Sequence, residues 1–206
     1  MNDTEERELM TAIQRQWGPL LDSAAKSSGI PAAFFAALIA NETGGNADAT
    51  RFEPAVFTAL AEVLLGRKAA YGSIGARDLS QWVVPQEDAA PGGVNYRNPS
   101  TVVLAGVRNL ADLATSFGLF QIMGYESIAF RTNGVHALQS PASEINIAVL
   151  MLNDFARRNA LDVKTNFSEL FDCWNTGRPH APTTDPTYIP DGLARLALYQ
   201  SLESAS

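Results

Sequence analysis

The sequence predicts a mostly α-helical fold of about eight helices, with at most a small β-hairpin. Apolar residues recur at spacings of three and four along much of the 206-residue chain, as they do on one face of a helix. No stretch alternates apolar and polar residues for long enough to indicate a regular strand. The hydrophobic fraction of 46% is ordinary for a globular protein, so the chain can build a core.

The first two helices are predicted by their apolar residues and by a break between them. Residues 9–24 place leucine, isoleucine, tryptophan and alanine on one helical face. Ser28-Gly29-Ile30-Pro31 ends that helix, and Pro31 suits the first turn of the next one. Residues 32–40 then contain no charge, which is typical of a helix buried on all sides, and they are too few to span a membrane.

Caps, prolines and periodic stretches predict the later elements. Ser140-Pro141 indicates a cap and a first turn, and Asn166 with Glu169 has the spacing of a capping box. Further helices are therefore expected over residues 54–67, 76–82, 101–114, 140–159, 166–174 and 191–202. Residues 83–99 and 176–186 are rich in turn formers and are expected to be irregular loops, the first of them an insertion. Residues 116–123 are the best candidate for the small hairpin.

We expect a single domain over residues 1–206, with residues 1–28 as an N-terminal helix. The one cysteine, Cys173, cannot form an intrachain disulfide, which fits folding in a reducing compartment. The acidic, polar start lacks the basic and apolar regions of a secretory signal. We therefore expect synthesis in the cytoplasm without a signal peptide. We also expect the protein to be a monomer.

The formal net charge of -7 argues against some classes of partner. A nucleic-acid binder needs a basic patch, and an anionic membrane surface attracts cations, so neither partner is expected. The charge also weighs mildly against a wall-binding enzyme, because the bacterial wall is polyanionic. His136, His180 and Cys173 have no metal-site spacing, and there is no glycine-rich phosphate loop. We therefore expect no metal and no cofactor.

Glu42 stands where the buried apolar helix meets a Gly44-Gly45 stop. Leu38 and Ile39 lie one turn back, so its carboxyl is expected at the edge of the core. Burial and the negative end of the helix dipole would both raise the pKa of this carboxyl, as a general acid at neutral pH requires. The alternative is a surface glutamate at a frayed helix end.

Two further segments have unusual composition. Gly118 among bulky residues suggests close backbone approach or a special dihedral, and Gln121 is an amide within an apolar run. The amide would bond either sugar groups or neighbouring backbone. Trp174, Asn175 and Gly177 near a helix end can line a sugar groove, or they can form a simple helix C-terminus.

In this order the segments resemble the lysozyme superfamily, in particular phage-type N-acetylmuramidases, soluble lytic transglycosylases and goose-type lysozymes. Those families have a helix ending in a catalytic glutamate, a Gly-Leu-Met-Gln-like segment, an aromatic-Asn-x-Gly motif and a tyrosine opening the last helix. The matching residues are Glu42-Thr43-Gly44-Gly45, Gly118-Leu119-Phe120-Gln121, Trp174-Asn175-Thr176-Gly177 and Tyr188. The segments 51–57 and 116–124 are most similar to the N-acetylmuramidase type. The resemblance covers roughly residues 30–200, apart from 66–100.

The resemblance implies a lysozyme-like helical domain that cleaves peptidoglycan strands between N-acetylmuramic acid and N-acetylglucosamine. Glu42 would protonate the glycosidic oxygen, and a second carboxylate, Glu53 rather than Asp48, would support the site or position a water. Glu53 would otherwise cap or salt-bridge the next helix. In the transglycosylase branch Glu42 acts alone, and the muramic 6-hydroxyl closes a 1,6-anhydro ring.

The resemblance also implies roles for the surrounding residues. Gln121 and the backbone near Ser116 would hold the sugars, Asn175 would shape the groove, and Tyr188 would orient Glu42 or the substrate. Phe120 and Trp174 depart from the usual methionine and tyrosine but keep the bulk.

Two alternatives to an enzyme stay open. The chain could be a non-catalytic module that binds wall or chitin oligosaccharides, or a helical domain unrelated to these families. For the enzyme, an endolysin-like protein without a signal must be delivered through a holin, with a virion or by a secretion system. It would act in the periplasm or on the cell wall after that delivery.

Overall fold

The computed structural model describes residues 2–83, 99–132 and 134–205. Within these residues it contains nine α-helices, one short 3-10 helix and five strands of two or three residues, which confirms the mostly α prediction. The contacts divide the chain into two compact units. Unit 1 comprises residues 1–49, 118–120 and 140–206, and unit 2 comprises residues 50–117 and 121–139. Each unit combines distant segments of the chain, and the expectation of a single domain stays a prediction.

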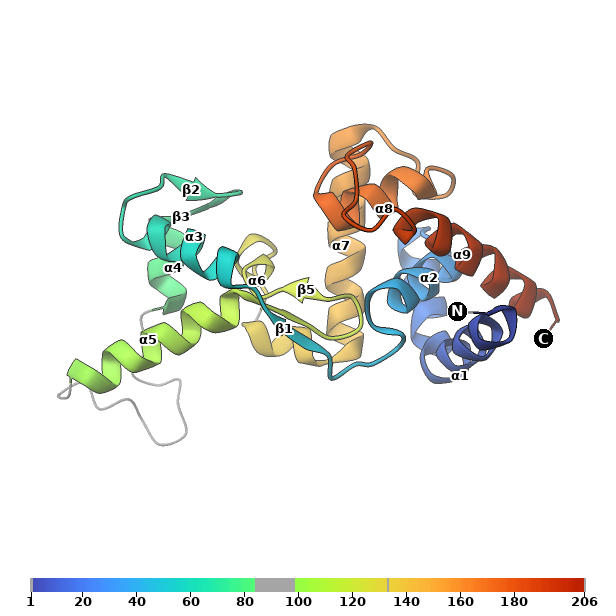
Figure 1. Cartoon of the computed structure of the whole chain (residues 1–206), viewed down its shortest axis with the longest axis horizontal. Helices are drawn as coiled ribbons and strands as arrows, with labels where there is room; N and C mark the ends of the chain where they lie inside the picture. Colours follow the sequence, from blue (N-terminus) through green and yellow to red (C-terminus); the bar gives the residue numbers. More distant parts are fainter. Residues whose placement is uncertain (1, 84–98, 133, 206) are drawn as a thin grey trace. The chain divides into compact units, whose positions relative to one another are not determined.

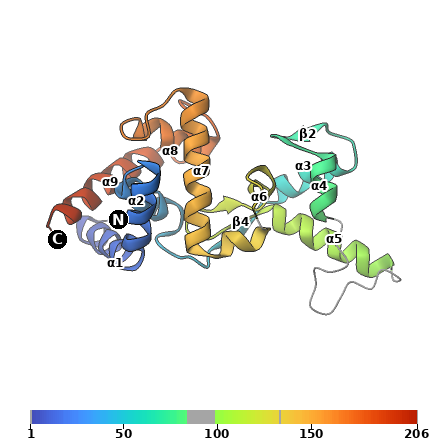
Figure 2. The same ribbon diagram turned by 180° about the vertical axis from the view of Figure 1, so that it is seen from behind.

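Unit 1 is a bundle of five helices, one of which is buried along most of its length (Figures 1 and 2). Its helices are α1 (Asp3–Ser28), α2 (Ala32–Thr43), α7 (Pro141–Asn159), α8 (Phe167–Thr176) and α9 (Tyr188–Ala205). Helix α2 packs against α1 and α9, and α8 packs against α7 and α9. Residues 32–40 of α2 are all buried, as the absence of charge predicted. Burial on all sides fixes α2 in the bundle and thereby fixes the position of the helix end at residues 41–43.

The break between α1 and α2 also agrees with the prediction. Gly29 caps α1 in the left-handed conformation at φ 78°, and Pro31 precedes α2. Helix α1 begins at Asp3, close to the start of the expected helix at residues 1–28, and Asn2 with Glu5 forms a reciprocal capping box there. The first helix therefore includes the acidic residues of the N-terminal segment.

Unit 2 combines short helices with two small antiparallel sheets. The first sheet has the order β1 (Thr50–Phe52), β4 (Thr115–Phe117) and β5 (Ile122–Met123). The second pairs β2 (Ala70–Tyr71) with β3 (Ile74–Gly75). The helices are α3 (Pro54–Leu64), α4 (Ala76–Val83), α5 (Pro99–Leu113) and α6 (Glu126–Ala129), after which comes the 3-10 helix η1 (Val135–Gln139). The predicted hairpin at 116–123 is confirmed as β4 and β5.

Unit 2 has an apolar core of its own. Its buried side chains come from α3, β3, α4 and α5, and include Leu60, Val63, Ile74, Leu79, Leu110 and Leu113. Ser116 pairs with Arg51 on one side and with Met123 on the other, so β4 is the central strand of the first sheet.

Some local predictions were wrong. The capping box at Asn166 is absent, because this residue precedes α8 but its side chain makes no bond to the start of that helix. Its Oδ1 instead accepts the backbone N–H of Asp162 at 2.8 Å. Ser140 likewise makes no side-chain cap, although α7 begins at Pro141 as predicted. Of the predicted loop at 83–99, Val83 ends α4 and Pro99 begins α5; residues 84–98 lie outside the described residues.

None of the helices within residues 2–83, 99–132 and 134–205 combines the length and the apolar character needed to cross a bilayer.

Candidate active site at the end of helix α2

Glu42 lies in the last turn of α2 and is half-buried, shortly after the nine buried residues of that helix. Gly44 and Gly45 follow Thr43, the last residue of α2, at φ 62° and 92°, and this left-handed pair ends the helix. Ile13 and Trp17 of α1 pack against Gly45, and the Trp17 Nε1–H donates to its carbonyl at 3.3 Å. The edge-of-core position predicted for this carboxyl is therefore the one that the fold gives it.

Tyr188 donates its hydroxyl hydrogen bond to Oε1 of Glu42 at 2.5 Å. Tyr188 opens α9 and is only 9% exposed, and its ring packs edge-on against Phe171. Burial raises the pKa of Tyr188 far above its usual value, and the neighbouring Glu42 adds to this shift. The phenol is therefore protonated at every physiological pH and acts as a fixed donor to the carboxyl group.

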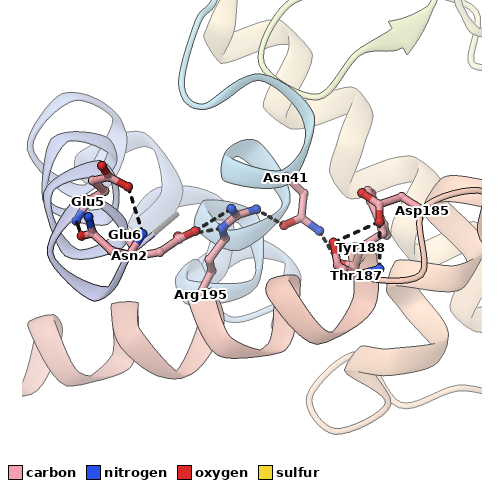
Figure 3. Close-up of polar contacts among 8 residues, drawn as sticks. All are labelled: Asn2, Glu5, Glu6, Asn41, Asp185, Thr187, Tyr188 and Arg195. Atoms are coloured by element: carbon pink, nitrogen blue, oxygen red, sulfur yellow. Dashed lines mark hydrogen bonds and ion pairs between the residues drawn. The ribbon is translucent and has the colours of Figure 1, made fainter.

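A chain of polar contacts continues from Tyr188 through α2 to α1 (Figure 3). Asn41 Nδ2 donates to the backbone carbonyl of Tyr188 at 2.8 Å, and Asn41 Oδ1 accepts from Arg195 Nη1 at 2.7 Å. Arg195 in turn donates Nε and Nη2 to the two carboxylate oxygens of Glu6, at 2.9 and 2.8 Å. The hydrogen bond from Arg195 holds the pKa of Glu6 below its usual value. Arg195 of α9 thus links Glu6 of α1 to Asn41 of α2, the residue that precedes Glu42.

The segment Gly118–Phe120 belongs to the same unit and contacts this helix end. Thr43, the residue after Glu42, donates its hydroxyl to the Leu119 carbonyl at 3.0 Å. Glu144 of α7 accepts the backbone N–H of Leu119 at 2.8 Å and that of Phe120 at 2.7 Å. Both backbone polar groups of Leu119 are therefore bonded by side chains from helices of unit 1.

Glu144 is a carboxyl group enclosed by protein, with only 1% of the residue exposed. Burial raises its pKa to about 8, although the two backbone N–H bonds act in the opposite direction. Gly118 approaches it closely: a Cβ at this position would lie 2.2 Å from Oε2 of Glu144. Gly118 also has φ 70°, so both reasons that the sequence suggested for a glycine here apply.

Three other predicted site residues, Glu53, Ser116 and Gln121, lie in unit 2. Ser116 is buried and donates to Gln121 Oε1 at 2.8 Å, so the structure brings these two side chains together. Glu53 precedes α3 without capping it and pairs with Arg51 at 2.6 Å. The partner lies in β1 and not in the next helix, so this ion pair is not the cap or salt bridge to α3 considered as the alternative for Glu53; the Arg51 side chain is 74% exposed and such pairs add little stability.

Asn175 and Asp48 are both exposed. Asn175 lies in the last turn of α8, and Asp48 lies in the loop after α2, where its backbone N–H donates to Asn46 Oδ1 at 3.0 Å. Next to Asn175, the ring of Trp174 packs against Phe120 at 5.9 Å between centroids. Phe120 and Trp174, the two residues that depart from the motifs of the families the sequence resembles, therefore contact each other.

Four residues of this site were not singled out from the sequence: Asn41, Glu6, Arg195 and Glu144. Asn41 adjoins Glu42, and that adjacency was the one available signal. The others are joined to the site only by folding, since Glu6 and Arg195 are 189 positions apart. Within the described residues no three His, Cys, Asp or Glu side chains are grouped as metal ligands.

Comparisons with models of protein families, with curated proteins and with solved structures gave no match.

Proposed function

We propose that the chain is a lysozyme-like enzyme that cleaves peptidoglycan strands between N-acetylmuramic acid and N-acetylglucosamine, with Glu42 as general acid. One observation carries this proposal: a carboxyl at the end of a buried helix accepts a short hydrogen bond from a buried tyrosine. Such a carboxyl is held in one orientation, which proton transfer to a bound oxygen requires. The ordered motifs that resemble the lysozyme superfamily supply the substrate class.

In the proposed reaction, Glu42 protonates the glycosidic oxygen as the bond to the muramic residue breaks. Because Tyr188 donates to Oε1, the proton to be transferred is carried on Oε2. A positive charge develops on the muramic ring, and the carboxylate left behind stabilises it. Gln121, the backbone near Ser116, Asn175 and Tyr188 hold the N-acetylated sugars in this proposal.

The same acid supports two outcomes. In the hydrolase, which we favour because of the Phe-Glu segment at residues 52–53, Glu53 positions a water that attacks the muramic carbon. In the transglycosylase, Glu42 acts first as acid and then as base, and the muramic 6-hydroxyl attacks.

The proposed site of action is the cell wall or the periplasm, after synthesis in the cytoplasm. Delivery through a holin, with a virion or by a secretion system is part of this proposal.

The variant Glu42→Gln tests the acid directly, because it keeps the shape and removes the transferable proton. Clearing of a cell-wall suspension should fall by about 100-fold or more, the usual contribution of general acid catalysis at its lower end. Glu62→Gln on α3 is the matched control, since Glu62 is exposed and belongs to no part of the proposed site. Thermal unfolding of both variants should stay close to wild type.

Clearing by Glu42→Gln at the wild-type rate would show that Glu42 is not the acid. A second candidate, a wall- or chitin-oligosaccharide-binding module, predicts saturable binding by both wild type and Glu42→Gln with no product from either.

A further inference from the structure

Helix α9 presents a stripe of three residues toward Asn41 of α2. Tyr188, Gly192 and Arg195 are spaced by four and three positions, so they lie on one helical face. Gly192 allows the close approach, because a Cβ there would lie 3.0 Å from Asn41 Nδ2 and 2.7 Å from Phe171 Cζ. The two residues flanking Gly192 on this face both bond Asn41 (Figure 3).

Arg195 fixes which way the Asn41 amide points. A guanidinium can only donate, so Asn41 must turn its oxygen to Arg195 and its nitrogen to the Tyr188 carbonyl. Arg195 itself is held by the two-pronged pair with Glu6 of α1, and its side chain is only 11% exposed. The direction of the whole chain of bonds is therefore set by the Arg195 guanidinium.

We propose that Arg195 and Asn41 are positioning residues for the acid: they hold the Tyr188 backbone so that its hydroxyl meets Glu42. This inference rests on the proposed function of Glu42. Asn41 bonds the Tyr188 carbonyl while Glu42, the next residue of α2, accepts the Tyr188 hydroxyl. Tyr188 of α9 is thus held at its backbone carbonyl and at its hydroxyl by two consecutive residues of α2. Displacing a positioned group by about an ångström can lower a rate by about 100-fold.

Arg195→Lys separates this role from simple stabilisation. A lysine keeps the charge for Glu6, but its single nitrogen cannot also reproduce the planar fork that reaches Asn41. We expect kcat to fall by about tenfold and KM to change by no more than about twofold. The substitution would disturb the position of the acid but would leave the contacts to the sugars in place. Asn41→Leu, which removes both amide contacts at similar volume, should give the same pattern. Arg157→Met, which breaks an exposed ion pair on α7, is the matched control and should leave kcat unchanged.

A double-mutant cycle with Tyr188→Phe tests whether the effect passes through the tyrosine. If it does, Asn41→Leu combined with Tyr188→Phe is no slower than the slower single variant. Full additivity of the two effects on kcat would overturn the proposal, and so would wild-type kcat in both Arg195→Lys and Asn41→Leu.

A spectroscopic readout keeps this inference separate from the proposed function. A tyrosine hydroxyl held by a short hydrogen bond to a carboxyl group gives a downfield, slowly exchanging proton signal, which Tyr188→Phe identifies by removing it. We expect Asn41→Leu to abolish that signal and Arg157→Met to retain it. If the signal persists in Asn41→Leu, the positioning role is wrong. If the signal is lost there but the wild-type protein cleaves no peptidoglycan, the network stands and the proposed function fails.

Discussion

Glu144 is the residue whose titration should be visible in the stability of the protein. Its pKa rises from 4.5 to about 8 on folding, so between these values the folded state keeps a proton that the unfolded state has released. The stabilising contribution is therefore complete below about pH 4.5 and is lost as the pH rises to about 8. We expect the free energy of unfolding, measured with denaturant, to fall over this interval.

Glu144→Gln is the variant that isolates this effect. The amide cannot ionise, so the decline of stability between about pH 5 and about pH 8 should be smaller than in wild type. Its nitrogen would also face one of the two backbone N–H donors, which should cost about 1–3 kcal/mol at the acidic end of this range. An unchanged decline in Glu144→Gln would mean that another group causes it.

Individual residues of the site differed in how far the sequence could predict them. Glu42 and Gly118 were singled out because each breaks a local pattern: a carboxyl after an apolar helix, and a glycine among bulky side chains. Glu144 lies shortly after Ser140-Pro141 and is an ordinary acidic residue for the first turn of a helix. Its burial depends on contact with a segment more than twenty positions away, which no local pattern reveals.

At the scale of the element, the segment between β4 and β5 contains Gly118, whose Cα lies too close to the Glu144 carboxyl for a side chain to fit. In Gly118→Ala the added methyl group would overlap the Glu144 carboxyl group, and the alanine would also have to adopt an unfavourable φ of 70°. We expect a loss of about 3 kcal/mol or more in the free energy of unfolding, since the overlap adds to the backbone strain.

Gly66→Ala is a matched control for that substitution. Gly66 has nearly the same φ, 71°, but a Cβ there would meet nothing within 4 Å among the described residues. Its replacement should therefore cost only the backbone term, about 1 kcal/mol. Equal losses in the two variants would contradict the close approach of Gly118 to Glu144.

Elements with a strong local signal were predicted well, and elements that depend on distant partners were not. The uncharged run predicted the burial of α2, and the Gly-Pro break predicted its start. Strand β1 and the β2–β3 hairpin are too short for alternation to be visible, and their pairing comes from contacts elsewhere. The capping box at Asn166 had the right spacing, but Asp162 competes for the same side chain.

At the scale of the whole molecule, the net charge of -7 makes a prediction about salt. The wall is polyanionic, so the proposed substrate and the protein repel each other. Raising the ionic strength from about 0.01 to about 0.15 M shortens the screening length from about 30 to about 8 Å. Wall clearing should accelerate over this range. A steady decrease would instead indicate that a local basic surface governs the encounter.

The whole-molecule organisation was the least predictable from sequence. Both units combine segments that are distant along the chain. The Glu6–Arg195 ion pair joins the first helix of the chain to the last. The charge pattern shows that cations are scattered along the chain. It does not show that Arg195 donates to the side-chain amide of Asn41, the residue before Glu42. Such pairings arise only when the helices pack, which is why Glu42 and Tyr188 were singled out from the sequence and Asn41, Glu6 and Arg195 were not.

Mass spectrometry of the fragments that wild-type protein releases from purified peptidoglycan tests the central claim most directly. We predict fragments that end in N-acetylmuramic acid, with a reducing end for the favoured hydrolase. Muramic ends one water lighter would identify the transglycosylase while leaving Glu42 as the acid. Release of peptides alone, fragments ending in reducing N-acetylglucosamine, or no fragments at all would contradict the assignment of this chain as a muramic-bond-cleaving enzyme.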